Sequence, residues 1–151
     1  MVDVTDKTES RRHARASCRV DSNLDADSLA QLMTPEVLMN ARLVGIQCAK
    51  RTSDVIPLCH PLALTAIDVT VQQLPQGFEV TADVTCSGRT GVEMEALCAC
   101  GFAALSLMDA LGEGARPRLY DLLLESKRGG TSGDWGREFE TSPPPESSHP
   151  I

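Results

Sequence analysis

Residues 65–86, TAIDVTVQQLPQGFEVTADVTC, contain two runs of alternating apolar and polar residues. The apolar positions are Ile67, Val69 and Val71 in the first run, and Phe78, Val80, Ala82, Val84 and Cys86 in the second. A period of two predicts half-buried strands, and Pro75-Gln76-Gly77 between the runs predicts a turn. The stretch therefore predicts an antiparallel hairpin with one apolar face.

Helical patterns lie on both sides of this hairpin. Thr34-Pro35-Glu36 combines an N-cap hydroxyl, a first-turn proline and an early acid, which predicts the start of a helix running to about Arg51. Because this helix is apolar on most sides, we expect it to be largely buried. A second long helix is predicted for residues 91–111. Asp25 should cap a short helix that carries Leu29, Leu32 and Met33.

Strand patterns lie towards both ends of the chain. Residues 13–20 alternate, with Ala14, Ala16, Cys18 and Val20 on one face, and a final strand is predicted near residues 119–126. The order β-α-α-β-β-α-β predicts an α+β sandwich, an antiparallel sheet with helices on one face. In so small a chain we expect a second subunit to cover the other face. Residues 1–135 should form one domain, and residues 136–151 a disordered tail.

Composition narrows the function classes. The net charge of −7 argues against a general nucleic-acid or membrane surface. The longest uncharged apolar stretch, residues 96–108, is shorter than the roughly 20 residues of a spanning helix. The N-terminal sequence has no apolar core of a signal peptide. Six cysteines without a CxxC pair predict free thiols in a reducing cytoplasm.

Two segments carry candidate chemistry. In Gly88–Glu95, Thr90 and Glu93 have the spacing of a capping box, while a glycine-flanked helix start beside Arg89 can equally hold phosphate oxygens. Neither interpretation explains Glu95. The glycine-rich run that begins with Lys127 is compatible with a phosphate-binding loop or with an ordinary surface turn.

Three further positions are ambiguous by themselves. Asp109 lies in the last turn of a predicted helix, where the helix dipole disfavours a carboxylate, so it is a functional candidate or a solvated acid. Cys59-His60 lies between two prolines, which favours a positioned imidazole without excluding a structural one. Lys50 fits a basic helix end. A metal site is not expected, because Cys98 and Cys100 point about 200° apart on a helix.

Four blocks of sequence together resemble cyclic pyranopterin monophosphate synthase. They are MVDVTDK (1–7), ARLVGIQCAKRTSDVIPLCHPL (41–62), GRTGVEMEAL (88–97) and KRGGTSGD (127–134), and they occur in order from Met1 to about Asp134. The resemblance implies a ferredoxin-like subunit in a cytoplasmic homohexamer, a trimer of dimers with pockets at the dimer interface. It also implies conversion of 3′,8-cyclo-7,8-dihydro-GTP to cyclic pyranopterin monophosphate, with release of pyrophosphate, in molybdenum cofactor biosynthesis.

The resemblance also implies a set of site residues by matching position. Lys50, His60, Asp109 and Lys127 are implied as catalytic, and Cys59, His60, Arg89, Thr90, Glu93 and Glu95 as substrate-binding. No cofactor is implied, although Mg²⁺ could accompany the triphosphate. The partner implied is a small purine-derived triphosphate, not a nucleic acid or a membrane.

The chain departs from the family pattern where it has Thr34, Gly112 and Thr131 in place of lysines. The lysine replaced by Gly112 follows the aspartate by three residues and is thought central to catalysis; here Gly112 fits a helix C-cap. Three hypotheses follow: an active enzyme that uses the remaining groups, a weak or inactive paralogue that binds a pterin or nucleotide or joins an active sister subunit, and altered chemistry on a related triphosphate. The first is favoured because most polar positions of the pocket remain.

Overall fold

The computed structural model describes residues 1–137. Its elements are β1 (Ser10–Asp21), α1 (Ala26–Leu32), α2 (Pro35–Ala49), α3 (Thr52–Val55), β2 (Leu64–Leu74), β3 (Gly77–Gly88), α4 (Glu93–Leu111), the 3₁₀ turn η1 (Glu113–Ala115), β4 (Arg118–Arg128) and β5 (Trp135–Gly136). The predicted order of strands and helices is confirmed; α3, η1 and β5 are additional. Of the predicted tail, 136–151, only Gly136 and Arg137 are described, and Gly136 is paired in β5.

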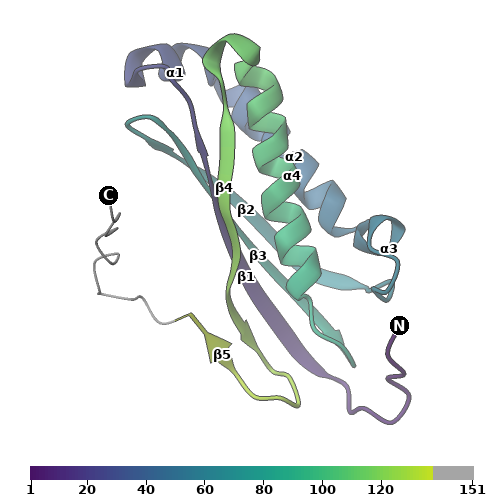
Figure 1. Ribbon diagram of the computed structural model, residues 1–151. Helices are drawn as coiled ribbons and strands as arrows, with labels where there is room; N and C mark the ends of the chain where they lie inside the picture. The colour runs from purple at the N-terminus through teal and green to yellow at the C-terminus, as the bar shows by residue number, and fades with distance from the viewer. Residues whose placement is uncertain (138–151) are drawn as a thin grey trace, which may run out of the picture.

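The sheet has the order β2-β3-β1-β4-β5, and each neighbouring pair is antiparallel. The predicted hairpin is confirmed as β2 and β3, and β1 lies between β3 and β4. Figure 1 shows α2 and α4 on one side of the sheet. The α+β, ferredoxin-like sandwich predicted from the sequence is therefore correct.

Small residues bring α4 close to the sheet and to α2. Its inward side carries Ala96, Ala99, Cys100, Ala103 and Ala104, all fully buried. At Gly45 of α2, a Cβ would lie 2.6 Å from the carbonyl oxygen of Ala99, so the two helices approach too closely for a side chain there. By length and composition α4 could cross a membrane, but 56% of its most apolar window is buried. It is a core helix rather than a membrane span.

Two expectations about the helices were wrong. Helix α2 is not largely buried: Met39 and Leu43 are 49% and 55% exposed, because a single chain provides no layer outside the helices. The capping box at Thr90 and Glu93 does not form. Val92 is the N-cap residue of α4 and no side chain caps the helix. The side chain of Glu93 pairs with a strand instead, as described below.

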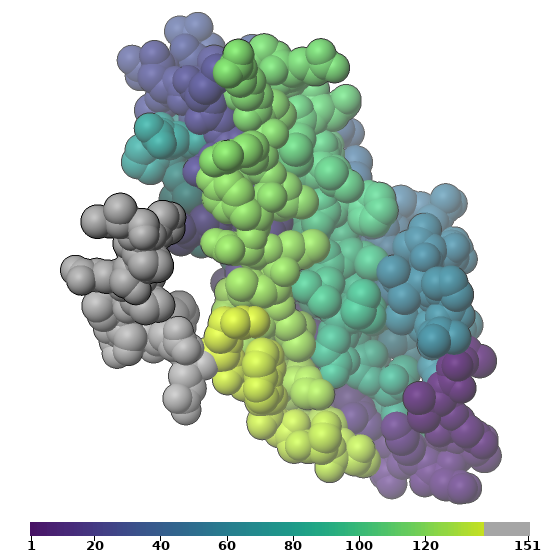
Figure 2. Space-filling model, in the orientation of Figure 1, coloured from purple at the N-terminus to yellow at the C-terminus, as the bar shows by residue number. Residues whose placement is uncertain are grey.

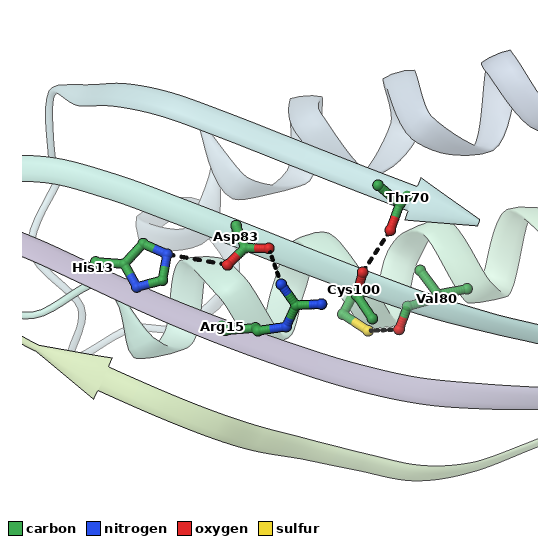
Figure 3. Close-up of polar contacts among 7 residues, drawn as sticks. His13, Arg15, Thr70, Val80, Asp83 and Cys100 are labelled. Carbon is green, nitrogen blue, oxygen red and sulfur yellow. Dashed lines mark hydrogen bonds and ion pairs between the residues drawn. The ribbon is translucent and has the colours of Figure 1, made fainter. Parts of the chain in front are cut away.

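The opposite sheet face carries polar pairs. Nε2 of His13 lies 3.0 Å from Oδ1 of Asp83, and Nη1 of Arg15 donates to Oδ2 of the same carboxylate at 2.7 Å (Figure 3). Below this face, in the core, Sγ of Cys100 lies 3.1 Å from Sγ of Cys18 and 3.3 Å from the carbonyl oxygen of Val80. All six cysteines are free thiols, as predicted. A subunit covering this face stays a prediction.

Candidate functional site

Two cavities meet where the chain enters α4. The cationic cavity, of about 190 Å³, is lined by five basic side chains from three regions of the chain, namely Lys7, Arg12, Arg89, Lys127 and Arg128. The mixed cavity, of about 260 Å³, is lined by Cys59, His60 and Glu95 together with apolar side chains. Thr90, Gly91 and Glu93 line both cavities, so the two are adjacent parts of one site.

The N-terminal segment belongs to this site. Nη1 of Arg89 donates to the carbonyl oxygen of Thr5 at 2.9 Å, which anchors the segment beside the helix start. Val2 lines the mixed cavity and Lys7 the cationic one. Figure 2 shows the segment (purple) at the same end of the molecule as the loop after β4 (yellow). Residues far apart in sequence therefore share one end of the molecule.

Arg12 is a buried cation without a complete set of partners. Its residue is only 5% exposed, and its Nε donates to the carbonyl oxygen of Gly88 at 3.2 Å. Its Nη2 is buried and has no hydrogen-bond partner within residues 1–137. A buried charge is costly unless it is paired, so an unpaired guanidinium beside a cavity indicates a place for an anion.

Sequence reasoning missed Arg12, although a signal was present. The alternating pattern predicts a strand over residues 13–20, but β1 starts at Ser10. When the alternation is extended backwards, Arg12 falls on the same face as the buried Ala14 and Ala16. An arginine at an inward position of a strand is unusual and could have been identified as a candidate.

Lys127 and Glu93 form an ion pair at the junction of the cavities. Nζ of Lys127 lies 3.3 Å from Oε1 of Glu93, and both side chains are about one-third exposed. Lys127 points to the helix side because β4 pairs with β1 in a register that sets it opposite the buried Ala14. The pair fixes an ammonium group beside the start of α4.

Glu95 is the buried acid of the site. The residue is 4% exposed, and burial raises its pKa from an ordinary 4.5 to about 6, with the nearby Glu93 carboxylate contributing in the same direction. Burial also raises the pKa of the Cys59 thiol, and Glu95 adds to that effect. Glu95 can therefore exchange a proton near neutral pH, whereas Cys59 stays a neutral thiol.

The structure brings together most of the site residues predicted from the sequence. Those that line one or both cavities are Cys59, His60, Arg89, Thr90, Glu93, Glu95 and Lys127. Lys50 is exposed at the C-cap of α2 and lines neither cavity. Asp109 is exposed near the other end of α4. It lies fourteen positions after Glu95, which corresponds to about 21 Å along the helix.

The three positions without the family lysines have different surroundings. Thr34 is the N-cap of α2, and its Oγ1 accepts a hydrogen bond from the Val37 amide at 3.4 Å. Thr131 lines the cationic cavity, which has five basic side chains without a lysine at this position. Gly112 is the C-cap of α4, as predicted, with φ 73° and ψ 168°. Among the described residues, no cluster of three or more His, Cys, Asp or Glu side chains could hold a metal ion.

Fold and site together define a class of protein. It is a small α+β domain with a preformed anion cavity beside a buried carboxyl group of raised pKa, an arrangement suited to acid–base chemistry on a phosphorylated compound. The family model for the MoaC family matches residues 1–130, and the chain belongs to that family.

The relatives in other organisms agree. The cyclic pyranopterin monophosphate synthase of Streptomyces coelicolor is 44% identical over 146 residues, covering 91% of this chain and 83% of the relative. The Streptomyces avermitilis enzyme of the same name is 42% identical over the same shares, and that of Streptomyces griseus is 41% identical over 150 residues. The predicted resemblance is therefore confirmed, and the relatives place the chain among lyases of this type.

Proposed function

We propose that this chain converts 3′,8-cyclo-7,8-dihydro-GTP to cyclic pyranopterin monophosphate and pyrophosphate, the lyase step in molybdenum cofactor biosynthesis. The observation that supports this most directly is the junction of a cationic cavity with a cavity that contains a buried acid. The reaction needs cations around a triphosphate and proton donors and acceptors around rings that open and close. The two cavities divide these tasks.

The cationic cavity is the proposed triphosphate subsite. Arg12 is desolvated and incompletely paired before any ligand binds, so binding an anion requires no further desolvation of the guanidinium. Lys7 and Arg89 supply positive charge at the exposed rim of the cavity. Such fixed cations stabilise the charge that develops on pyrophosphate as it leaves.

The mixed cavity is the proposed acid–base subsite. With a pKa of about 6, Glu95 holds a proton in part of the molecules at neutral pH and can give or take one. His60 lines the same cavity and provides a second proton carrier. Cys59 remains a neutral thiol and serves in binding. Lys127 reaches from the cationic side to the boundary, held by Glu93.

Asp109 enters the proposal only through a second copy of the chain. A substrate of this size does not span the roughly 21 Å from Glu95 to Asp109 within one chain. A dimer that sets the far end of one α4 against the start of another would complete the site. We therefore propose a homo-oligomer in which two copies of the chain form each site. The alternative is a mixed oligomer in which an active sister subunit provides the second part of the site.

One observation favours the weaker alternative, a paralogue that binds the ligand with little turnover. The backbone at Gly112 has φ 73° and ψ 168°, a region that residues other than glycine avoid. The end of α4 therefore lacks the lysine and also has a backbone conformation that favours glycine. Loss of a general acid costs roughly 10²–10⁴-fold in rate.

The deciding experiment is turnover of the purified protein on the cyclised GTP intermediate, with product and pyrophosphate measured separately. We expect both to form in equal amounts, and Lys127→Ala and Asp109→Asn each to lower their formation by roughly 10²–10⁴-fold. Asp27→Asn is the matched control for Asp109→Asn, because Asp27 is also an exposed helical carboxylate and lines neither cavity. Tight calorimetric binding of the intermediate without product would select the paralogue instead. No product and no binding would reject both.

A further inference from the structure

The Glu93 carboxylate occupies the space above Gly91. A Cβ at residue 91 would overlap Oε2 of Glu93 and would lie 2.7 Å from its Cδ and 2.8 Å from its Oε1. These three nearest atoms all belong to one carboxylate, and none belongs to the backbone. Any other residue type at this position would therefore have to displace the Glu93 carboxylate.

The backbone itself does not require glycine at this position. The glycines with positive φ among residues 1–137 are Gly112, Gly129 and Gly133, so Gly91 has a conformation open to alanine. An alanine would fit after a rotation of the flexible Glu93 side chain, without moving the chain. The absence of a side chain at residue 91 therefore makes room for the Glu93 carboxylate and is not required by the backbone conformation.

The Glu93 carboxylate has no capping role that would explain its position. Helix α4 has no side-chain cap, and Oε1 of Glu93 instead lies 3.3 Å from Nζ of Lys127. Glu93 lines both cavities, and it also acts on the buried Glu95, whose proton it helps to retain. One carboxylate thus contacts the ammonium on one side and influences the acid on the other.

We infer that Gly91 is a positioning residue: by lacking a side chain it lets the Glu93 carboxylate lie across the entry to α4 and hold the Lys127 ammonium at the junction of the two cavities. The kinetic part of this inference rests on the proposed function. The geometric part does not, since the contacts exist without substrate. A larger residue at 91 would leave the fold intact and release Lys127.

A double-mutant cycle tests the inference. In the parent protein, Gly91→Ala should lower kcat/KM by about 10- to 100-fold, as expected for a misplaced reacting group. In a Glu93→Ala background no carboxylate remains to be displaced, so the same change should have less than about a twofold effect. Gly114→Ala is the control, because a Cβ there meets nothing within 4 Å. Thermal midpoints of all variants should stay close to the parent.

A second readout needs no turnover. The Glu95 carboxyl carbon can be titrated by NMR in the free protein, where Gly91→Ala should move the midpoint down towards its value in Glu93→Ala. Adding Gly91→Ala to Glu93→Ala should change nothing. Equal effects of Gly91→Ala in both backgrounds, or none in the parent, would overturn the inference. If the parent shows this coupling in NMR but forms no product, the proposed function fails and the positioning role stands.

Discussion

The two ends of α4 differ in how completely one chain builds them. At the start of the helix, residues from the N-terminus, β1, β4 and the loop before β2 surround two cavities, and the fold provides a buried cation and an acid of raised pKa. At its end, Asp109 is exposed, and its side chain forms no hydrogen bond or ion pair within residues 1–137.

An acid can be assigned a role in a site only when the groups around it are known. Glu95 has them in the single chain, whereas those of Asp109 would have to come from another copy. The exposed apolar side chains of the helix layer, Met39, Leu43, Phe102 and Leu105, are compatible with such a contact.

The largest effect is expected when the two ends are inactivated in separate chains. Lys127→Ala and Asp109→Asn should each lower turnover by roughly 10²–10⁴-fold. If each site uses one end from each of two copies, co-expressing the variants should restore about a quarter of the parent activity in randomly assembled dimers. Turnover of differently tagged, co-purified chains measures this. A mixture as inactive as its components would show that the two ends do not share a site.

Arg12→Met should separate binding from stability. Loss of a charged hydrogen bond should weaken calorimetric binding of inorganic pyrophosphate by roughly 10- to 100-fold. The thermal midpoint should stay or rise, since an incompletely paired buried charge is removed. Arg15→Met is the control, because Arg15 is exposed and paired with Asp83 on the other sheet face. If both variants weaken pyrophosphate binding equally, the binding depends on net charge and not on the cationic cavity.

The elements of the fold could be predicted because each depends on neighbours in sequence. Alternation identified β1, β2 and β3, and Thr34 and Asp25 marked two helix starts that the structure confirms. Burial of α2 was overestimated, because a pattern shows which sides are apolar but not how many layers one chain can place around them.

The site was predictable in its residue types and not in its pairings. Glu93 has the spacing of a capping box, but in the structure its carboxylate pairs with the Lys127 ammonium. This pair depends on the strand register that sets Lys127 opposite Ala14, which the sequence pattern does not show. Arg12 needed the true start of β1. The separation of Asp109 from Glu95 follows from helix length alone and could have been calculated from the predicted helix.

Gly112→Lys tests the end of α4 directly. A Cβ there meets nothing within 4 Å, so no clash opposes the substitution. The backbone conformation does oppose it, and we expect a loss of about 1–3 kcal/mol in the free energy of unfolding. Gly114→Lys, where φ is not positive, should cost less. Chemical denaturation gives both values. A gain in turnover despite the lost stability would identify the absent lysine as the defect, and a neutral Gly112→Lys would refute the backbone argument.

The smallest effect concerns the pH dependence of stability that the buried Glu95 carboxyl group causes. Burial raises its pKa to about 6, above the ordinary 4.5, so the folded chain binds this proton more tightly than the unfolded chain. Stability should therefore fall as pH rises from about 4.5 to about 6 and then remain lowered, by about 2 kcal/mol in total.

Glu95→Gln should abolish this pH dependence, since a neutral amide has no proton to lose. The variant should match the parent near pH 4.5 and exceed it by about 2 kcal/mol near pH 7.5, while turnover is lost. Urea denaturation at both pH values provides the measurement, and Glu113→Gln, at an exposed position, should keep the parent behaviour. If Glu95→Gln is no more stable at pH 7.5, the carboxyl group is solvated like that of Asp109, and the contrast between the two ends of α4 disappears.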